Sequence, residues 1–259
     1  MSERANPSGF PVELEGVEKS FGTRRVLASL HLRVPRGRNL VVMGLSGTGK
    51  SVTLKILAGL LRPDAGSVRV AGVEVTTAGR REMAAVRSNL GFLFQGAALI
   101  KWLTAVENVA LPLLEAGMPA AQAEQKAHAR LAELGMADAA HQSPDELSGG
   151  QRKRVGFARA TIHDPKIILY DEPTTGLDPI TKRTVDELIV RGRDQYGATG
   201  VIVSHDLRSA LRVADLIGLL YEGRMVAVGA PQEFLSSDHE IVRRFIDDDA
   251  PVGGAEART

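Results

Sequence analysis

Apolar and polar positions alternate along the chain with two different periods. Short apolar segments rich in β-branched residues are separated by longer segments whose apolar residues recur at helical spacing, a pattern typical of an α/β fold. The segments that predict strands of a core sheet are 39–43, 90–94, 166–170, 200–203, 216–221 and 225–228. Strands at 12–14 and 30–34, with a hairpin at 67–75, predict a small antiparallel region.

Helices are predicted between these strands. Residues 52–61 carry leucines at helical spacing, and Pro63 with Gly66 is expected to end this helix. Two more helices are predicted at 179–193 and 206–213.

The segment 104–145 differs in composition from the rest of the chain. It is rich in Ala, Leu, Glu and Gln, and its apolar period is helical. We expect it to be divided into short helices at Pro112, at Gly117 with Pro119, and at Gly135. We therefore predict an inserted helical subdomain here.

The composition is that of a folded protein. Of 259 residues, 44% are hydrophobic and 24% are charged, which excludes wholesale disorder. Lys and Arg (32) nearly balance Asp and Glu (31), which argues against a protein that coats polyanions, and the lack of Cys excludes disulfides and thiolate metal sites. The longest stretch without charged residues or His, 88–100, has 13 residues and is too short to span a membrane, and residues 1–10 lack the apolar region of a secretory signal. We expect a soluble intracellular protein that reaches a membrane only through a partner, with a polar, frayed tail at 247–259.

A phosphate-binding motif lies between the first core strand and the helix that follows it. The sequence matches G-x-x-x-x-G-K-[ST] without mismatch, through Gly44, Leu45, Ser46, Gly47, Thr48, Gly49, Lys50 and Ser51. The glycines allow successive N–H groups to point at phosphate oxygens, and the helix N-terminus adds partial positive charge. Lys50 is expected to reach the β- and γ-phosphates, and the Ser51 hydroxyl to ligate Mg²⁺. A glycine-rich turn with an exposed lysine is the alternative, but the complete motif in this context favours nucleotide binding.

Two carboxylates follow the strand predicted at 166–170. Asp171 and Glu172 are adjacent, so strand alternation predicts that they point to opposite sides. Asp171 is then expected to hold the Mg²⁺ shell while Glu172 polarises an attacking water. Solvated acids at a strand end are the alternative, but the phosphate loop in the same chain favours hydrolysis of a nucleoside triphosphate.

A second anion-binding helix start is predicted at residues 147–151, which we call the signature segment. Ser148 suits the N-cap position, and the bare backbone of Gly149 and Gly150 can approach a phosphate closely. One nucleotide does not need two such helix starts from one chain, so the segment suggests a nucleotide shared between two copies. The alternative is a well-capped surface helix, with 152–154 as its solvated basic face. The string Leu-Ser-Gly-Gly-Gln resembles the signature of the ATP-binding cassette (ABC) ATPases.

The resemblance to ABC ATPases extends over residues 12–246, with the motifs in family order. Phe21 resembles the aromatic residue that stacks on adenine, although the family more often has Tyr there. Gln95 resembles the glutamine that contacts Mg²⁺ and water and communicates with the membrane partner. Asp178 lies in a string that resembles the loop crossing to the other subunit, and His205 resembles the switch histidine at the γ-phosphate.

The resemblance implies a P-loop NTPase fold of the α/β class, with a mostly parallel core sheet, an antiparallel β region and an inserted helical subdomain. An ABC ATPase domain at 11–246 would comprise a RecA-like core, 11–95 and 163–246, and a helical subdomain, 96–162. The implied cofactors are ATP and Mg²⁺, the metal held by Ser51, Gln95 and Asp171. ATP would lie between Lys50 of one copy and the signature segment of the other, so that the nucleotide-binding residues include Ser148, Gly149, Gly150 and Gln151. Glu172 would act as general base, with His205 positioning the water.

The resemblance also implies membrane partners. Two copies would serve transmembrane permease subunits, with the stretch 95–147 as the docking region. The strings at 94–99, 178–181, 219–224 and 244–246 resemble the ATPase of Mla-type phospholipid transporters, which work with a lipid-binding subunit of the mammalian-cell-entry type between the inner and outer bacterial membranes. The chain would then lie at the cytoplasmic face of the inner membrane.

Three alternatives remain open. The cassette could move another substrate, such as an amino acid, a metal or a drug. A non-transport ABC protein acting on ribosomes or chromosomes would need a second cassette or a long coiled coil, and the near-neutral charge lacks the basic footprint of a nucleic-acid binder. A catalytically inactive binding module is disfavoured by the intact Lys50, Asp171, Glu172 and His205.

Overall fold

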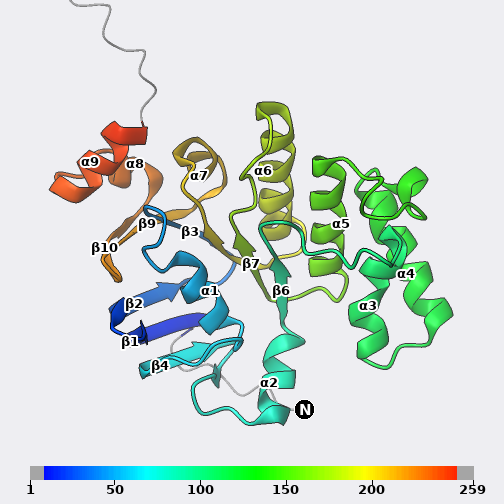
Figure 1. Ribbon diagram of the computed structural model, residues 1–259, viewed down its shortest axis with the longest axis horizontal. Helices are drawn as coiled ribbons and strands as arrows, with labels where there is room; N and C mark the ends of the chain where they lie inside the picture. Colours follow the sequence, from blue (N-terminus) through cyan, green and yellow to red (C-terminus); the bar gives the residue numbers. More distant parts are fainter. Residues whose placement is uncertain (1–8, 250–259) are drawn as a thin grey trace, which may run out of the picture.

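The larger of two β-sheets forms the centre of the molecule (Figure 1). The computed structural model describes residues 9–249. Six strands lie in the order β10-β9-β3-β8-β7-β6, and all pair in parallel except β10, which pairs antiparallel with β9. Their bounds are β3 (Asn39–Met43), β6 (Leu90–Leu93), β7 (Ile167–Asp171), β8 (Thr199–Val203), β9 (Leu216–Tyr221) and β10 (Arg224–Gly229).

Both faces of this sheet are covered, and the sequence of its strands shows why. Leu40 and Val42 of β3 pack into the core shared with the smaller sheet, whereas Val41 and Met43 pack into the core beneath the helices. Alternation with period 2 therefore buries the side chains on both faces of β3, and the four residues after Asn39 form a continuous apolar run. Each of these buried side chains stabilises the fold by about 1.5–3 kcal/mol.

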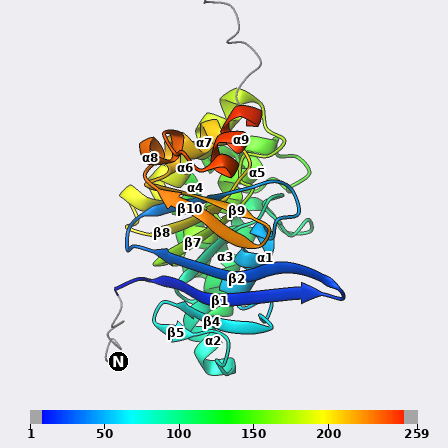
Figure 2. The same ribbon diagram turned by 90° about the vertical axis from the view of Figure 1, so that its left-hand side faces the viewer.

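The smaller sheet is antiparallel and packs beside the larger one (Figure 2). Its order is β2-β1-β4-β5, and the strands are β1 (Val12–Phe21), β2 (Arg24–Val34), β4 (Ala65–Val70) and β5 (Val73–Glu74). The predicted hairpin at 67–75 is confirmed, but β1 and β2 are far longer than the strands predicted at 12–14 and 30–34. Register shifts after Leu14 and Val17 interrupt the alternation on which the sequence prediction depended.

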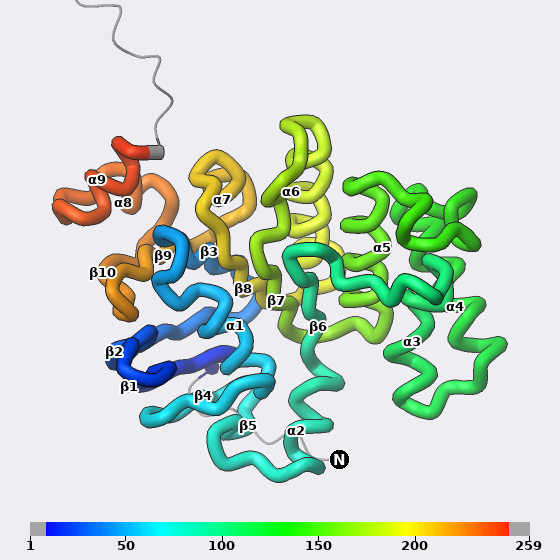
Figure 3. Tube along the Cα trace, in the orientation of Figure 1, coloured from blue at the N-terminus to red at the C-terminus, as the bar shows by residue number. Residues whose placement is uncertain are grey.

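Helices α3, α4 and α5 gather at one end of the molecule and α8 and α9 at the other (Figure 3). The helices are α1 (Lys50–Leu57), α2 (Arg80–Arg87), α3 (Ala105–Glu115), α4 (Ala120–Glu133), the 3₁₀ helix η1 (Ala137–Ala139), α5 (Gly149–Thr161), α6 (Pro179–Asp194), α7 (Leu207–Val213), α8 (Pro231–Leu235) and α9 (Glu240–Asp249). Within the described range, none of them has both the length and the apolar character needed to cross a membrane.

The helices differ from the sequence prediction in four places. Helix α1 ends at Leu57, before Gly59 with φ 64°, and does not continue to residue 61 and Pro63. Pro112 lies inside α3 and does not end it, because burial of Val109 and Leu113 offsets the roughly 3 kcal/mol cost of proline within a helix. Helix α2 was not predicted, since only Met83 and Val86 of its eight residues are buried. Helices α8 and α9 were not predicted either; α9 includes 247–249 of the predicted tail, and 250–259 lie outside the described residues.

Candidate nucleotide-binding site

The phosphate loop connects the carboxyl end of β3 to α1, and none of its three glycines can be replaced without strain, because all have positive φ. Gly44 has φ 151°, and a Cβ there would lie 2.4 Å from the Leu220 carbonyl oxygen. Gly49 has φ 106°, and its Cβ would lie 2.7 Å from Leu27 Cδ2. Gly49 is also the N-cap of α1 and has no side chain with which to cap the first turn. The N–H groups of that turn are therefore available to an anion.

Lys50 lies over this loop. Its side chain is 7% exposed, and Nζ donates to the carbonyl oxygens of Gly44 (2.6 Å) and Leu45 (3.1 Å). Burial lowers the pKa of Lys50, and the Glu172 carboxylate 3.7 Å away opposes that effect. The ammonium group thus stands between the loop and a carboxylate, where it can meet phosphate oxygens.

A hydroxyl in the first turn of α1 meets a carboxylate at the carboxyl end of β7. Ser51 Oγ donates to Asp171 Oδ1 at 2.8 Å. Oxygen ligands of this kind suit Mg²⁺, which commonly binds one or two protein oxygens and takes its other ligands from phosphate and water. Accordingly, the described residues contain no cluster of three or more His, Asp or Glu side chains able to hold a metal. Ser51 and Asp171 therefore fit Mg²⁺ bound together with a nucleotide.

Glu172 has partners different from those of Asp171. Its Oε2 lies 2.8 Å from His205 Nδ1 and accepts a hydrogen bond from Thr175 Oγ1 at 3.0 Å. The sequence prediction attributed the divergence of the two carboxylates to strand alternation, and this reason is wrong. Strand β7 ends at Asp171, and Glu172 has φ 45°, in the left-handed region that non-glycine residues seldom adopt. The strained residue is thus the one whose carboxylate lies between Lys50 and His205.

The loop after Gln95 is fastened to α5 by two basic side chains. Lys153 Nζ donates to the Gln95 carbonyl oxygen, and Arg159 donates to the carbonyl oxygens of Ala97 (2.6 Å) and Ala98 (2.8 Å). Ala97 and Ala98 have φ 60° and 45°, so both are in the left-handed region. We call these contacts the α5 clamp.

The sequence analysis did not identify the α5 clamp. Its alternative interpretation put Lys153 on a solvated basic face, and its favoured one gave Lys153 no role, whereas Lys153 is 4% exposed. Burial lowers its pKa to about 8, against the opposing charges of Asp171 and Glu172. Spacing could have given the signal, because Lys153 shares a buried helix face with Gly156, Phe157 and Ala160.

The signature segment starts α5. Ser148 is the N-cap: its Oγ accepts from Gln151 N (3.2 Å), and its own N–H donates to Gln151 Oε1 (2.8 Å). A Cβ on Gly149 would meet Leu177 at 3.4 Å, and one on Gly150 would meet Thr181 at 2.9 Å, so the segment lies beside the loop that contains Asp178.

The structure does not bring the signature segment to the phosphate loop of the same chain. Helix α5 packs against β6, whereas the phosphate loop follows β3, and β8 and β7 lie between β3 and β6 (Figure 3). Three strand spacings correspond to about 14 Å.

Phe21 and Asp178 stand at the ends of their elements. Phe21, at the end of β1, is 50% exposed, and Lys19 Nζ lies 5.6 Å from its ring centroid. Arg24, the first residue of β2 after the turn that follows β1, contacts the phosphate loop by donating to the Gly47 carbonyl oxygen at 3.2 Å. Asp178 caps α6 by accepting from Ile180 N and Thr181 N at 3.0 and 3.1 Å.

Comparisons with known proteins give the family. A family model described as "ABC transporter" matches residues 27–175. The chain is 38% identical to the "Probable ribonucleotide transport ATP-binding protein mkl" of Mycobacterium tuberculosis, over 98% of this chain and 73% of that protein. It is 41% identical to the "Lipoprotein-releasing system ATP-binding protein LolD" of Bacteroides thetaiotaomicron (75% and 90%) and 37% identical to the "Methionine import ATP-binding protein MetN" of Leifsonia xyli (91% and 70%).

Solved structures agree with this result. A dimeric post-hydrolysis structure of the ATP-binding cassette MJ0796 bound to ADP and Pi aligns with a TM-score of 0.77 at 32% identity, over 85% of this chain and 98% of that one. The α/β P-loop fold expected from the sequence is thereby confirmed. The chain belongs to the ABC transporter family and is an ATP-hydrolysing cassette of that family.

Proposed function

We propose that two copies of this cassette enclose two ATP molecules, each held between the phosphate loop of one copy and the signature segment of the other. The observation that carries this proposal is the distance between two anion-binding helix starts. One follows β3 and the other packs beside β6, so one chain cannot close both on one triphosphate. The dimeric form of the related MJ0796 cassette supports the same arrangement. Phe21 stacks on adenine, and Asp178 lies at the seam between the copies.

Each residue around the γ-phosphate has a separate role in ATP hydrolysis. Glu172 accepts the proton of the attacking water, and His205, 2.8 Å from it, orients the water and stabilises developing charge. Lys50 meets the β- and γ-phosphate oxygens. Mg²⁺, when bound, neutralises charge on those oxygens. Ser51 and Asp171 hold the metal from the protein side, with Gln95 reaching it from the loop after β6.

We infer further that the cassette powers phospholipid transport between the two membranes of a bacterium. It would dock on permease subunits through residues 95–147 at the cytoplasmic face of the inner membrane, beside a lipid-binding subunit of the mammalian-cell-entry type. The support is the resemblance of the strings at 94–99, 178–181, 219–224 and 244–246 to Mla-type ATPases. The relatives' names point to ribonucleotides, methionine and lipoproteins, so another substrate is the competing proposal.

Reconstitution with the permease in liposomes tests the substrate. We expect labelled phospholipid to move between membranes with ATP but not with ADP, and lipid to copurify with the assembled complex in mass spectra. ATP-driven uptake of methionine or a ribonucleotide, with no movement of lipid, would contradict the phospholipid proposal while leaving the ATPase assignment intact.

A further inference from the structure

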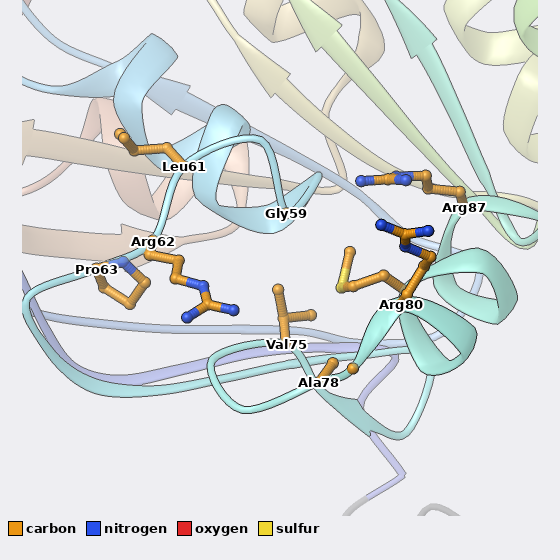
Figure 4. Close-up of a pocket in the computed structure, with 10 residues that line it drawn as sticks. Gly59, Leu61, Arg62, Pro63, Val75, Ala78, Arg80 and Arg87 are labelled. Atoms are coloured by element: carbon orange, nitrogen blue, oxygen red, sulfur yellow. The ribbon is translucent and has the colours of Figure 1, made fainter.

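A hollow of about 310 Å³ lies beside α2, and none of the residues of the candidate nucleotide-binding site lines it (Figure 4). We call it the arginine pocket. Its walls come from the segment after α1, the segment between β5 and α2, and α2 itself. Three of the residues that line it are arginines, Arg62, Arg80 and Arg87, and no Asp or Glu among the described residues lines it. Arg62 reaches toward the hollow from one side, and Arg80 and Arg87 from the other (Figure 4).

The pocket is separate from the nucleotide-binding site. Helix α1 begins at the phosphate loop with Lys50, and the pocket lies beyond its other end, at Gly59 and Leu61. Eight residues of helix correspond to about 12 Å. A nucleotide phosphate on Lys50 therefore does not fill the arginine pocket.

Its three arginines lack anionic partners. Among the residues that the structure describes, none of the three has a side-chain hydrogen bond or an ion pair. Elsewhere arginines do face carboxylates, as Arg193 does with Asp215 and Arg212 with Asp186, both at 3.0 Å. Three guanidinium groups around one hollow repel each other, and a bound anion would remove that repulsion.

Helix α2 adds to this positive field. Arg80 is its first residue, where the positive end of the helix dipole disfavours a cation. Arg80 and Arg87 are seven residues apart, so they lie on one face of α2, with Met83 between them. Both therefore line the same wall of the pocket.

The floor of the pocket is apolar and closed. Val75, Ala78 and Met83 line it and are buried. A Cβ on Gly59 would lie 2.1 Å from Met83 Cε. The absence of a side chain at Gly59 therefore allows Met83 to pack against it at the floor of the pocket. The volume is at the lower end of the roughly 300–1,000 Å³ of small-molecule sites.

We propose that the arginine pocket binds an organic phosphate, with its phosphate oxygens on the guanidinium groups and a short apolar portion over the floor. The planar fork of arginine matches phosphate oxygens through paired hydrogen bonds. The phosphate could belong to a lipid headgroup or to a soluble phosphate ester. Arg87 also borders a second hollow along the free edge of β6, which includes Phe94 and Ala98. An occupant would thus fix one side of the surface where we expect the permease to dock.

Calorimetric titration of the full chain, saturated with ADP so that the phosphate loop is filled, tests the pocket with glycerol 3-phosphate as the soluble probe. Sedimentation with phosphatidylglycerol vesicles, against phosphatidylcholine vesicles, tests the lipid source. We expect the double variant Arg80→Gln/Arg87→Gln to lower the affinity for the bound probe at least ~10-fold. The double variant with Lys at both positions should recover only part of the affinity, because lysine keeps the positive charge but lacks the planar guanidinium group that makes paired hydrogen bonds.

Arg81→Gln is the matched control, because Arg81 is exposed on the same helix and does not line the pocket. Unchanged ADP affinity checks that each variant is folded. Pocket-dependent binding of glycerol 3-phosphate alone, or of phosphatidylglycerol vesicles, supports the pocket and identifies the source. Absence of binding to both probes, or an equal loss in Arg81→Gln, would overturn the proposal.

Discussion

At the scale of single residues, the backbone of Glu172 separates the two carboxylates. A left-handed glutamate costs about 1–2 kcal/mol relative to an ordinary conformation. The carboxylate so placed lies 3.7 Å from Lys50 Nζ and 2.8 Å from His205 Nδ1, whereas Asp171 meets Ser51. Strain at this position is the expected sign of a functional constraint.

The substitution Glu172→Gln tests the assigned base. The amide keeps the shape and can still bond to His205, but it cannot accept a proton from water. We expect ATP affinity within about twofold of wild type and turnover lower by ~10²–10⁴-fold. Binding titrations and phosphate-release rates measure the two effects.

Glu222→Gln is a matched control for this substitution. Glu222 has φ 46°, nearly that of Glu172, but it is exposed in the turn after β9. Its turnover should equal that of wild type. Normal turnover by Glu172→Gln would show that another group acts as base.

At the scale of elements, the α5 clamp connects the helix that begins with the signature segment to the loop after Gln95. Arg159→Met removes two charge-assisted hydrogen bonds that hold Ala97 and Ala98 in left-handed conformations. We expect this loop to open more easily by about 1.5–3 kcal/mol, so that its amides exchange with solvent ~10–100 times faster. Hydrogen exchange followed by mass spectrometry measures the rate at residues 96–100.

Arg208→Met provides the comparison, because Arg208 is exposed on α7 and its side chain has no hydrogen bond or ion pair among the residues described. Exchange at 96–100 should not change in this variant. If Arg159→Met also left that exchange unchanged, the clamp would not hold the loop.

Asp215 joins two other parts of the fold, the start of β3 and the last turn of α6. It accepts hydrogen bonds from Asn39 N (2.8 Å), Arg193 Nη1 (3.0 Å) and Arg38 Nη1 (3.0 Å). Burial raises the pKa of Asp215, but these donors outweigh it, and the pKa lies below its ordinary value. Because the folded-state pKa is below the unfolded one, near 4, the stabilisation is complete above about pH 4 and is lost as the pH falls through the folded-state pKa.

Asp215→Asn should therefore lower the free energy of unfolding by about 1–3 kcal/mol at pH 7. The difference from wild type should shrink below pH 4, where the wild-type carboxylate becomes protonated. Urea unfolding at pH 7 and pH 3.5 measures it. Asp138→Asn is the control, because Asp138 is exposed on η1, and its free energy of unfolding should match that of wild type at both pH values. If Asp215→Asn lost the same free energy at pH 7 and at pH 3.5, the explanation from charge would be refuted.

At the scale of the whole molecule, the sequence predicts elements better than their arrangement. Strand β9 has the predicted bounds because its apolar run is continuous, and the phosphate loop was recognisable because every position of its motif is local. The order of the six strands depends on contacts between distant segments and was not predicted. The α5 clamp was not predicted either, because it also depends on contacts between distant segments: Arg159 contacts the carbonyl groups of Ala97 and Ala98, about 60 residues earlier.

The whole-molecule prediction is that an intact nucleotide site needs two chains. Lys50→Ala removes the phosphate-loop cation, and Gly149→Asp puts a negative charge at the start of α5. Gly149 does not have positive φ, and a Cβ there meets only Leu177, at 3.4 Å, so the second variant should fold. In a Glu172→Gln background, where ATP stays bound, each variant alone should occlude almost no ATP.

Mixing the two variants in equal amounts should restore binding. Each mixed dimer would then have one site in which both parts are wild type and one site that carries both defects. Random pairing predicts about a quarter of the ATP occluded by unmutated chains in the same background. Filter binding of labelled ATP, with size-exclusion chromatography to follow the dimer, measures this fraction. If each chain built its site alone, the mixture would occlude no more ATP than its components, and the shared site would be excluded.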